Sequence, residues 1–341
     1  MPPWRCWLAR RSRAATFSWS NVQLNRREFL TGSALSLAAA GCARRPQVAR
    51  ETLVSVLRLK DYGQELYGEV RRVLADHRLN VRGKRVLLKP NLIEFDPHSP
   101  INTHPMVVHA ALEAFRALGA EVSIGEGPGH RRNTLDLADA AGYFQAIPRF
   151  EELFTDLNVD SIARIRLAQP HSRLRSLYLA QSALACDLLV SMPKMKTHHW
   201  VGATLSMKNL FGTVPGGVYG WPKNVLHWAG IPQCVADLYH ILPRHFAIVD
   251  GIVGMEGNGP IQGKAKAAGV VVAGHDLAAV DATCCQIMSI DPLRIEYLKL
   301  AVADVGELCR LTRQIGEPIN NVGTTFDLMP EWKGIRLKGR A

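Results

Sequence analysis

The sequence lacks the short motifs that mark common cofactor and metal sites. Its seven cysteines form no Cys-x-x-Cys pair, which disfavours a zinc ribbon and an iron–sulfur cluster. No Gly-x-Gly-x-x-Gly and no Walker-type lysine motif follows the first expected strand, so no nucleotide fingerprint is present. No His-x-x-x-His helix motif ties its histidines together. Motifs therefore assign neither a cofactor nor a metal, and the sequence leaves the cofactor and the metal unknown.

The net positive charge is small outside the N-terminal segment. The 341 residues include 41 basic and 30 acidic side chains, a formal net charge of +11. Residues 1–50 hold nine arginines and one acid, Glu28, which is +8 and leaves only +3 for the rest of the chain. No helix-turn-helix, zinc-finger or aromatic RNA-binding signature accompanies this charge. We therefore expect no nucleic-acid partner.

The N-terminal segment has the pattern of an export signal. Residues 25–30 read Asn-Arg-Arg-Glu-Phe-Leu, which matches the twin-arginine consensus. Residues 29–41 form a stretch that is too short and too weakly apolar for a permanent membrane span, and residues 31–43 carry no charge. Alanines 38–40 then offer a cleavage site. We expect residues 1–43 to be a leader and 44–50 a linker. The twin-arginine machinery would then export the protein to the periplasm or cell envelope.

The cysteines raise a question of membrane attachment. Residues 37–42 resemble a lipoprotein cleavage box that ends at Cys42, so lipidation at Cys42, simple cleavage and an uncleaved leader anchor all stay open. The five later cysteines lie in apolar segments. We expect them to be small buried hydrophobic residues rather than disulfides. They are Cys186, Cys234, Cys284, Cys285 and Cys309.

From residue 51 onward, strand-like and helix-like segments alternate. The expected strands cover residues 52–59, 84–92, 121–125, 187–192, 246–250 and 269–273. The expected helices cover residues 63–77, 104–118, 133–143, 229–242, 277–288 and 294–305. This alternation predicts an α/β fold, Rossmann-like, with a mostly parallel sheet and helices on both faces.

Three other segments interrupt or end the alternation. Residues 144–183 resemble an insertion with short strands, which leaves two lobes open within an α/β domain that covers residues 51–310. Glycines and prolines in residues 211–224 predict a long mobile loop, and such loops are usually functional. Residues 311–341 are expected to be a C-terminal tail.

Polar residues follow four of the expected strands. Because the carboxyl ends of parallel strands share one edge of a sheet, these residues are expected to meet in one crevice. Several lysines there favour an anionic ligand such as a carboxylate or phosphate, and glycine-rich turns at 125–129 and 251–259 could add backbone donors. The expected substrate-binding residues are Lys89, Asn91, His130, Lys194, Lys196, Lys208 and Asn209. The alternative is that the lysines are solvated surface charges.

Acid–base chemistry is the simplest use for the remaining polar groups. Three residues are the expected proton-transfer groups, because nearby lysines can shift the pKa of a carboxylate or an imidazole. They are His198, Asp250 and Glu256. Asp281 either faces the same crevice or supports it. The same region contains side chains of the types that bind a divalent metal, although their spacing matches no metal-binding motif. They are His104, His130, His198, His199, Asp250 and Glu256.

Three of these segments resemble the bacterial and archaeal family known as domain of unknown function 362. They are Lys-Pro-Asn at 89–91, Met-Pro-Lys-Met-Lys-Thr-His at 192–198 with Ser-Met-Lys-Asn-Leu-Phe-Gly at 206–212, and the run 250–260. The likeness covers roughly residues 84–305. It implies no agreed activity, and the ferredoxin-like module of some members is missing here. The turn at 127–131 is also faintly similar to a Gly-x-His-Arg segment of lactate racemases, which bind a hydroxy acid.

These observations predict an exported enzyme that acts on a small anionic substrate, of unassigned reaction class. The alternative is a non-catalytic ligand- or cofactor-binding protein of the cell envelope, which needs shape and charge but no poised base. A third reading, an interaction scaffold, would require an exposed apolar patch.

Overall fold

The computed structural model describes residues 51–130, 133–242 and 244–338. These described residues form one compact unit. The twin-arginine motif, Cys42 and the expected leader and linker lie outside the described residues. Within the described ranges, no helix is long and apolar enough to cross a membrane.

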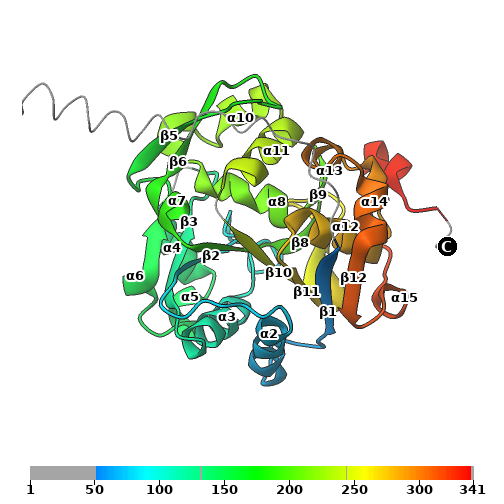
Figure 1. Ribbon diagram of the computed structural model, residues 1–341, viewed down its shortest axis with the longest axis horizontal. Helices are drawn as coiled ribbons and strands as arrows, with labels where there is room; N and C mark the ends of the chain where they lie inside the picture. Colours follow the sequence, from blue (N-terminus) through cyan, green and yellow to red (C-terminus); the bar gives the residue numbers. More distant parts are fainter. Residues whose placement is uncertain (1–50, 131–132, 243, 339–341) are drawn as a thin grey trace, which may run out of the picture. The chain divides into compact units, whose positions relative to one another are not determined.

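Ten strands of the described chain form one mixed sheet (Figure 1). Its main order is β12-β1-β11-β10-β7-β2-β3-β4, and β8 and β9 extend it beside β10. Most neighbouring pairs are parallel, which confirms the expected α/β fold with a mostly parallel sheet. The strands are β1 (Thr52–Arg58), β2 (Arg85–Pro90), β3 (Glu121–Glu126), β4 (Phe154–Asp156), β7 (Leu188–Met192), β8 (Lys194–His198), β9 (Gly202–Thr204), β10 (His245–Glu256), β11 (Lys264–Gly274) and β12 (Thr312–Gly316).

The strand β11 is antiparallel to both of its neighbours, β1 and β10. It follows β10 after a short connection, and the two strands form a long hairpin. The strand expected at 246–250 therefore continues to Glu256. Residues 251–256, which were expected to belong to a glycine-rich turn, are part of this strand, so the prediction is wrong there. Gly254 tolerates this because its missing side chain leaves room for Phe326 and the Met195 carbonyl.

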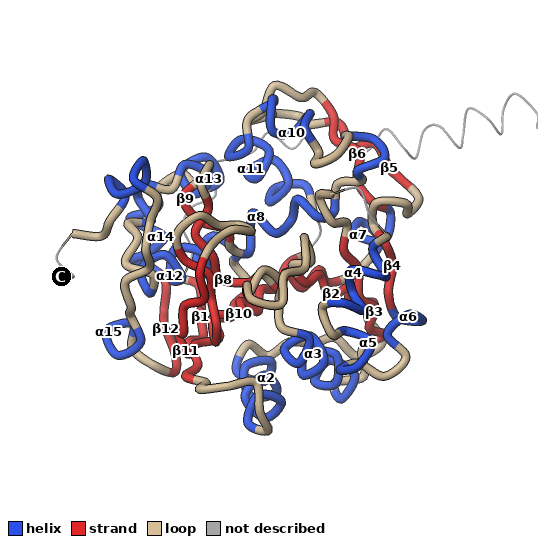
Figure 2. Tube along the Cα trace, turned by 180° about the vertical axis from the view of Figure 1, so that it is seen from behind, coloured by secondary structure: helices blue, strands red, loops and turns tan. Residues whose placement is uncertain are grey.

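Helices cover both faces of the sheet (Figures 1 and 2). Strand residues alternate between two hydrophobic clusters: Leu87 packs in the cluster of α8, α11 and α12, and its neighbour Leu88 packs in the cluster of α2 and α3. The longer helices are α2 (Glu65–Asp76), α3 (Pro105–Ala117), α4 (Thr134–Ala140), α11 (Ile231–Ile241), α12 (Leu277–Ile287) and α14 (Val305–Leu311).

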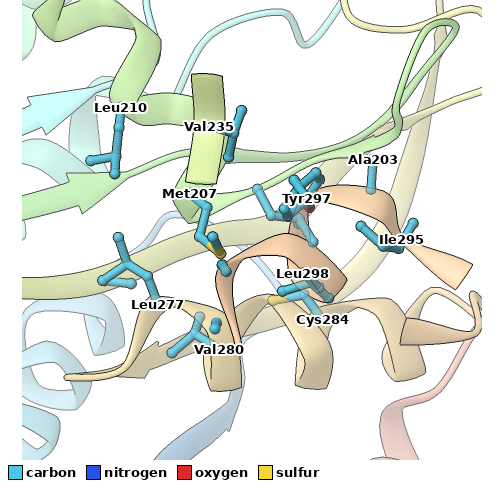
Figure 3. Packing of buried hydrophobic residues seen from close by; sticks show 14 of the residues in the cluster. Ala203, Met207, Leu210, Val235, Leu277, Val280, Cys284, Ile295, Tyr297 and Leu298 are labelled. Atoms are coloured by element: carbon cyan, nitrogen blue, oxygen red, sulfur yellow. The ribbon is translucent and has the colours of Figure 1, made fainter. Parts of the chain in front are cut away.

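Shorter helices fill the connections. They are α5 (Tyr143–Ala146), α6 (Phe150–Leu153), α7 (Gln181–Ala185), α8 (Ser206–Asn209), η1 (Leu210–Thr213), α9 (Gly216–Tyr219), α10 (Asn224–Ala229), η2 (Pro292–Arg294), α13 (Glu296–Ala301), α15 (Ile319–Val322) and η3 (Pro330–Ile335). Figure 3 shows Met207 of α8 among the side chains of α11, α12 and α13, with Leu277 and Val280 nearby. Although α8 has only four residues, this packing holds it against the sheet.

Two expectations about the connections need correction, and one is confirmed. Residues 211–224 were expected to be an irregular loop, but they contain part of η1 and all of α9, and half of them are buried. The segment expected to be a tail contributes β12, which pairs with β1. The expected short strands in the insertion are present as β5 (Ile162–Arg166) and β6 (Ser176–Ala180), a separate antiparallel pair.

Candidate functional site

A cavity of about 480 Å³ lies beyond the carboxyl ends of β2, β3 and β8. Segments far apart in the sequence line it, beginning near residues 91, 126, 198, 208, 222 and 258. The expected site residues that line it are Asn91, His130, His198, Lys208 and Asn209. The expected site residues that do not line it are Lys89, Lys194, Lys196, Asp250 and Glu256. The sheet edge thus brings together about half of the predicted residues.

Lys89 lies beneath the cavity in a closed polar network. Its Nζ is 2.6 Å from Glu126 Oε2 and also donates to Asn209 Oδ1 at 3.1 Å. Neither charged side chain is more than 2% exposed. Burial lowers the pKa of Lys89, and the adjacent Glu126 carboxylate opposes that shift. Lys89 is therefore tied to an internal acid and holds Asn209 at the cavity wall.

Lys194 and Asp250 form a second buried ion pair, on the opposite face of the sheet. Lys194 Nζ is 2.6 Å from Asp250 Oδ2, and Tyr62 Oη donates to Asp250 Oδ1 at 3.1 Å. Ile248 and Ile252, two residues on either side of Asp250, pack in the cluster of α2 and α3. Because side chains alternate along a strand, Asp250 lies on that face and away from the cavity. This placement argues against the expected catalytic role of Asp250.

Lys196 and Glu256 are also engaged elsewhere. Lys196 Nζ is buried and donates to the carbonyls of Ile101 at 2.9 Å and Pro260 at 3.2 Å. Glu256, at the far end of β10, lies 3.3 Å from Lys266 Nζ and accepts from the Asp327 amide at 3.0 Å. The expectation that they face the ligand needs correction, because their bonds fasten loops to the sheet.

Lys208 differs from these buried lysines. It lines the cavity, and its Nζ lies 4.0 Å from the centre of the Phe211 ring. Within the described part of the chain it makes no hydrogen bond or ion pair. Burial, reinforced by the charge of Lys89, lowers the pKa of Lys208 from 10.5 to about 8. Among the residues that the structure describes, this amine therefore has no counter-ion.

Asp281 of α12 holds the helix that carries Lys208. Its carboxylate accepts the backbone amides of Ser206 at 2.7 Å and Met207 at 3.1 Å, and it also accepts the Ser206 hydroxyl. Asp281 is fully buried and does not line the cavity. Of the two roles left open by the sequence, support of the site is the one that the geometry favours.

His198 lines the cavity and carries a hydrogen-bond donor. Its Nδ1 accepts the backbone N–H of Trp200 at 3.0 Å. Burial, with the charge of Lys208 next in size, lowers the pKa of His198 well below its ordinary value, so the ring is neutral at pH 7. A neutral ring whose Nδ1 accepts carries its proton on Nε2. The hydrogen bond therefore favours a donor role for His198 over the expected role of base.

His199 and His227 have the opposite tautomer. The Nδ1 of His199 lies 2.7 Å from the Gly259 carbonyl, and that of His227 lies 3.1 Å from the Lys223 carbonyl. A carbonyl only accepts, so Nδ1–H donates and the neutral ring keeps its lone pair on Nε2. Both residues line the cavity. The sequence suggested His199 only as a metal ligand and gave no signal for His227, which tertiary contacts bring to the site.

Other polar groups complete the lining. Lys223 Nζ donates to the carbonyls of Gly127 at 2.7 Å and Phe211 at 3.0 Å, and burial lowers its pKa to about 7. His130 Nδ1 lies 3.4 Å from Glu94 Oε2. In the described part of the chain, two lining residues have buried atoms without a hydrogen-bond partner, Asn91 Oδ1 and Thr204 Oγ1. Such buried polar atoms normally find a partner, so a bound ligand or water would satisfy them.

The metal alternative receives no support from the donor geometry. Among the described residues, no three His, Cys, Asp or Glu side chains converge in a group that could hold a metal ion. His104 stacks on Tyr62 with ring centres 3.7 Å apart, in the network of Asp250. It is therefore separated from the histidines that line the cavity.

A family model described as "Domain of unknown function (DUF362)" matches residues 86–286, more than half of the chain. The chain belongs to this family. The matched range includes all the cavity segments, the Lys89–Glu126 pair and Asp281. The candidate site therefore lies wholly within the DUF362 domain.

The chain is also similar to two known proteins. The thylakoid-associated protein sll1697 of Synechocystis sp. is 29% identical over 219 residues, which are 62% of this chain and 65% of the relative. The match thus spans just under two thirds of that relative. The lactate racemase apoprotein from Thermoanaerobacterium thermosaccharolyticum matches with a TM-score of 0.42 and 14% identity, over 72% of this chain and 59% of that one. A likeness at this level carries no functional argument.

Proposed function

We propose that this DUF362 protein is an enzyme that binds a small anionic substrate in the cavity beside Lys208. The observation that carries this proposal is the absence of a counter-ion for Lys208 among the described residues. An unpaired charge in a buried site is unfavourable, so a bound carboxylate or phosphate would be stabilised there. The N–H at His198 Nε2 adds a second donor.

Proton transfer is the chemistry that the histidines support. His199 and His227 each offer an Nε2 lone pair in the same cavity as the His198 donor. A donor and an acceptor that face one ligand can move a proton without a metal. A non-catalytic binding protein of the cell envelope remains the second candidate, since it would use the lysine but not the two bases.

The location proposed for this enzyme is outside the cytoplasm. The twin-arginine pattern at residues 25–30 supports export through the twin-arginine machinery to the periplasm or cell envelope. Attachment to the membrane through the leader or Cys42 belongs to the same proposal. A relative whose name describes it as thylakoid-associated is compatible with a membrane-associated or exported protein.

Calorimetric titration of the full chain with small carboxylates and with inorganic phosphate tests the binding step. Lys208→Met should abolish binding, and Lys208→Arg should preserve part of it, because the positive charge remains. Lys84→Met is the matched control, because it removes the same charge at the opposite, N-terminal end of β2. Unchanged binding in Lys208→Met would refute the proposal.

Turnover separates the two candidate functions. The anions that bind are incubated with the protein in deuterated water, and exchange of their carbon-bound hydrogens is followed by NMR. His199→Gln and His227→Gln should keep binding and lose exchange by about 100-fold or more, the usual contribution of a general base. Binding without any exchange in the wild-type chain would favour the non-catalytic protein.

A further inference from the structure

We propose that Lys208 is a nucleophile that forms an imine with the carbonyl carbon of an anionic 2-oxo acid. This inference rests on the proposed function, because it names the substrate class of the same cavity. It also gives Lys208 a covalent role in addition to its charge.

Comparison with the buried lysines distinguishes Lys208, which is only partly buried. Lys89 and Lys194 pair with carboxylates, and Lys196 and Lys223 each donate to two backbone carbonyls. A nitrogen held by such acceptors is fixed against the protein and is not free to approach a substrate carbonyl. Lys208 has no such acceptor within the described residues, and it lines the cavity.

The surroundings of Lys208 favour the neutral amine. Burial and the charge of Lys89 lower its pKa to about 8, and they act against the Phe211 ring, whose centre lies 4.0 Å from Nζ and which favours the cation. A substantial minority of the amine is therefore neutral near pH 7, whereas an ordinary lysine is almost fully protonated. Desolvation beside other cations is a known way to activate a lysine nucleophile.

The proposed step balances with groups that line the cavity. The Nζ lone pair attacks the carbonyl carbon, and the carbonyl π electrons move to the oxygen, which accepts a proton from the donor side of the site. The carbinolamine nitrogen loses a proton to an acceptor such as Nε2 of His199 or His227. The hydroxyl then takes up a proton and leaves as water, and the nitrogen lone pair forms the C=N bond.

The charge of the product explains why the substrate is anionic. A protonated imine keeps one positive charge at the position of the original ammonium. The substrate carboxylate therefore retains its counter-ion after the covalent bond has formed. The His198 Nε2–H has no partner in the described chain. It can donate to the substrate carboxylate or to the oxygen of the carbonyl group.

Reductive trapping tests the inference. The full chain is incubated with pyruvate and sodium cyanoborohydride, digested, and mapped by mass spectrometry. One reduced adduct is expected, on Lys208, and it should form about tenfold or more faster than any adduct on the exposed Lys84. Lys208→Arg should lose the adduct, and Lys84→Met should keep it. An adduct spread over surface lysines, or none, would overturn the inference.

Calorimetry with pyruvate in the same samples separates two kinds of failure. Binding that depends on Lys208, without any trapped adduct, overturns the imine and leaves the anion site standing. If pyruvate neither binds nor forms an adduct, and the other carboxylates and phosphate do not bind either, then the imine and the anion site are both overturned. A Lys208→Arg chain that binds pyruvate without trapping, beside a wild-type chain that traps it, supports both.

Discussion

Removal of Lys208 should make the protein more stable. In the folded chain the pKa of Lys208 falls from 10.5 to about 8. A pKa difference of this size corresponds to about 3 kcal/mol, because each unit is worth about 1.4 kcal/mol. The folded state bears this cost in full below about pH 8 and loses it as the pH rises to about 10.5, since the unfolded chain binds the proton more tightly in that window.

The predicted gain follows from this linkage. Lys208→Met keeps an unbranched side chain beside Phe211 and removes the cation. We expect the free energy of unfolding to rise by about 1–3 kcal/mol near pH 7, and the gain to shrink towards zero near pH 10.5. The charged and titratable groups whose fields interact with Lys208 are Lys89, Glu126, Lys196, His198, Lys223, His227 and Cys234.

Urea unfolding at both pH values measures the effect, and Lys89→Met is the matched control. Lys89 is a fully buried lysine, and its loss leaves the carboxylate of Glu126, 2% exposed, without its partner. That variant should lose about 3–5 kcal/mol. If Lys208→Met were destabilised by more than about 1 kcal/mol at neutral pH, or if its gain did not depend on pH, Lys208 would have a structural partner and the reasoning would fail.

Three further outcomes are expected. Lys194→Met should lose about 3–5 kcal/mol of stability, because Asp250 loses its partner, while calorimetry shows unchanged anion affinity. Asp281→Ala should lower the free energy of unfolding by about 3 kcal/mol and weaken anion binding, because two buried backbone donors before Lys208 lose their acceptor; unchanged affinity would contradict its positioning role. The rate of pyruvate trapping at Lys208 should rise about tenfold per pH unit up to about pH 8 and then level off, and a rise that continues to about pH 10 would indicate an ordinary lysine.

Local patterns in the sequence predicted the elements of the fold. The run of apolar residues at 187–192 predicted a buried strand, and it is β7 (Leu188–Met192). The helical spacing of residues 104–118, with Gly119 after it, predicted α3 (Pro105–Ala117). Such patterns are readable because they report which side of an element is buried, and the elements together define the α/β class.

The pattern of strand ends also predicted where the cavity lies, because parallel strands bring their carboxyl ends to one edge of a sheet. It did not predict that β10 continues as a strand to Glu256. The hairpin of β10 with β11 decides that, and this pairing is made by another segment of the chain.

The sequence by itself determined the fold class and the sheet edge at which the cavity lies. Only the tertiary structure decided which lysine faces a ligand. Lys89 is paired with Glu126, 37 residues away, and Lys194 with Asp250, 56 residues away, whereas Lys208 has no such partner in the described chain. The charge of a side chain is a local property, but its neutralisation depends on which distant groups the fold places within a few ångströms of it.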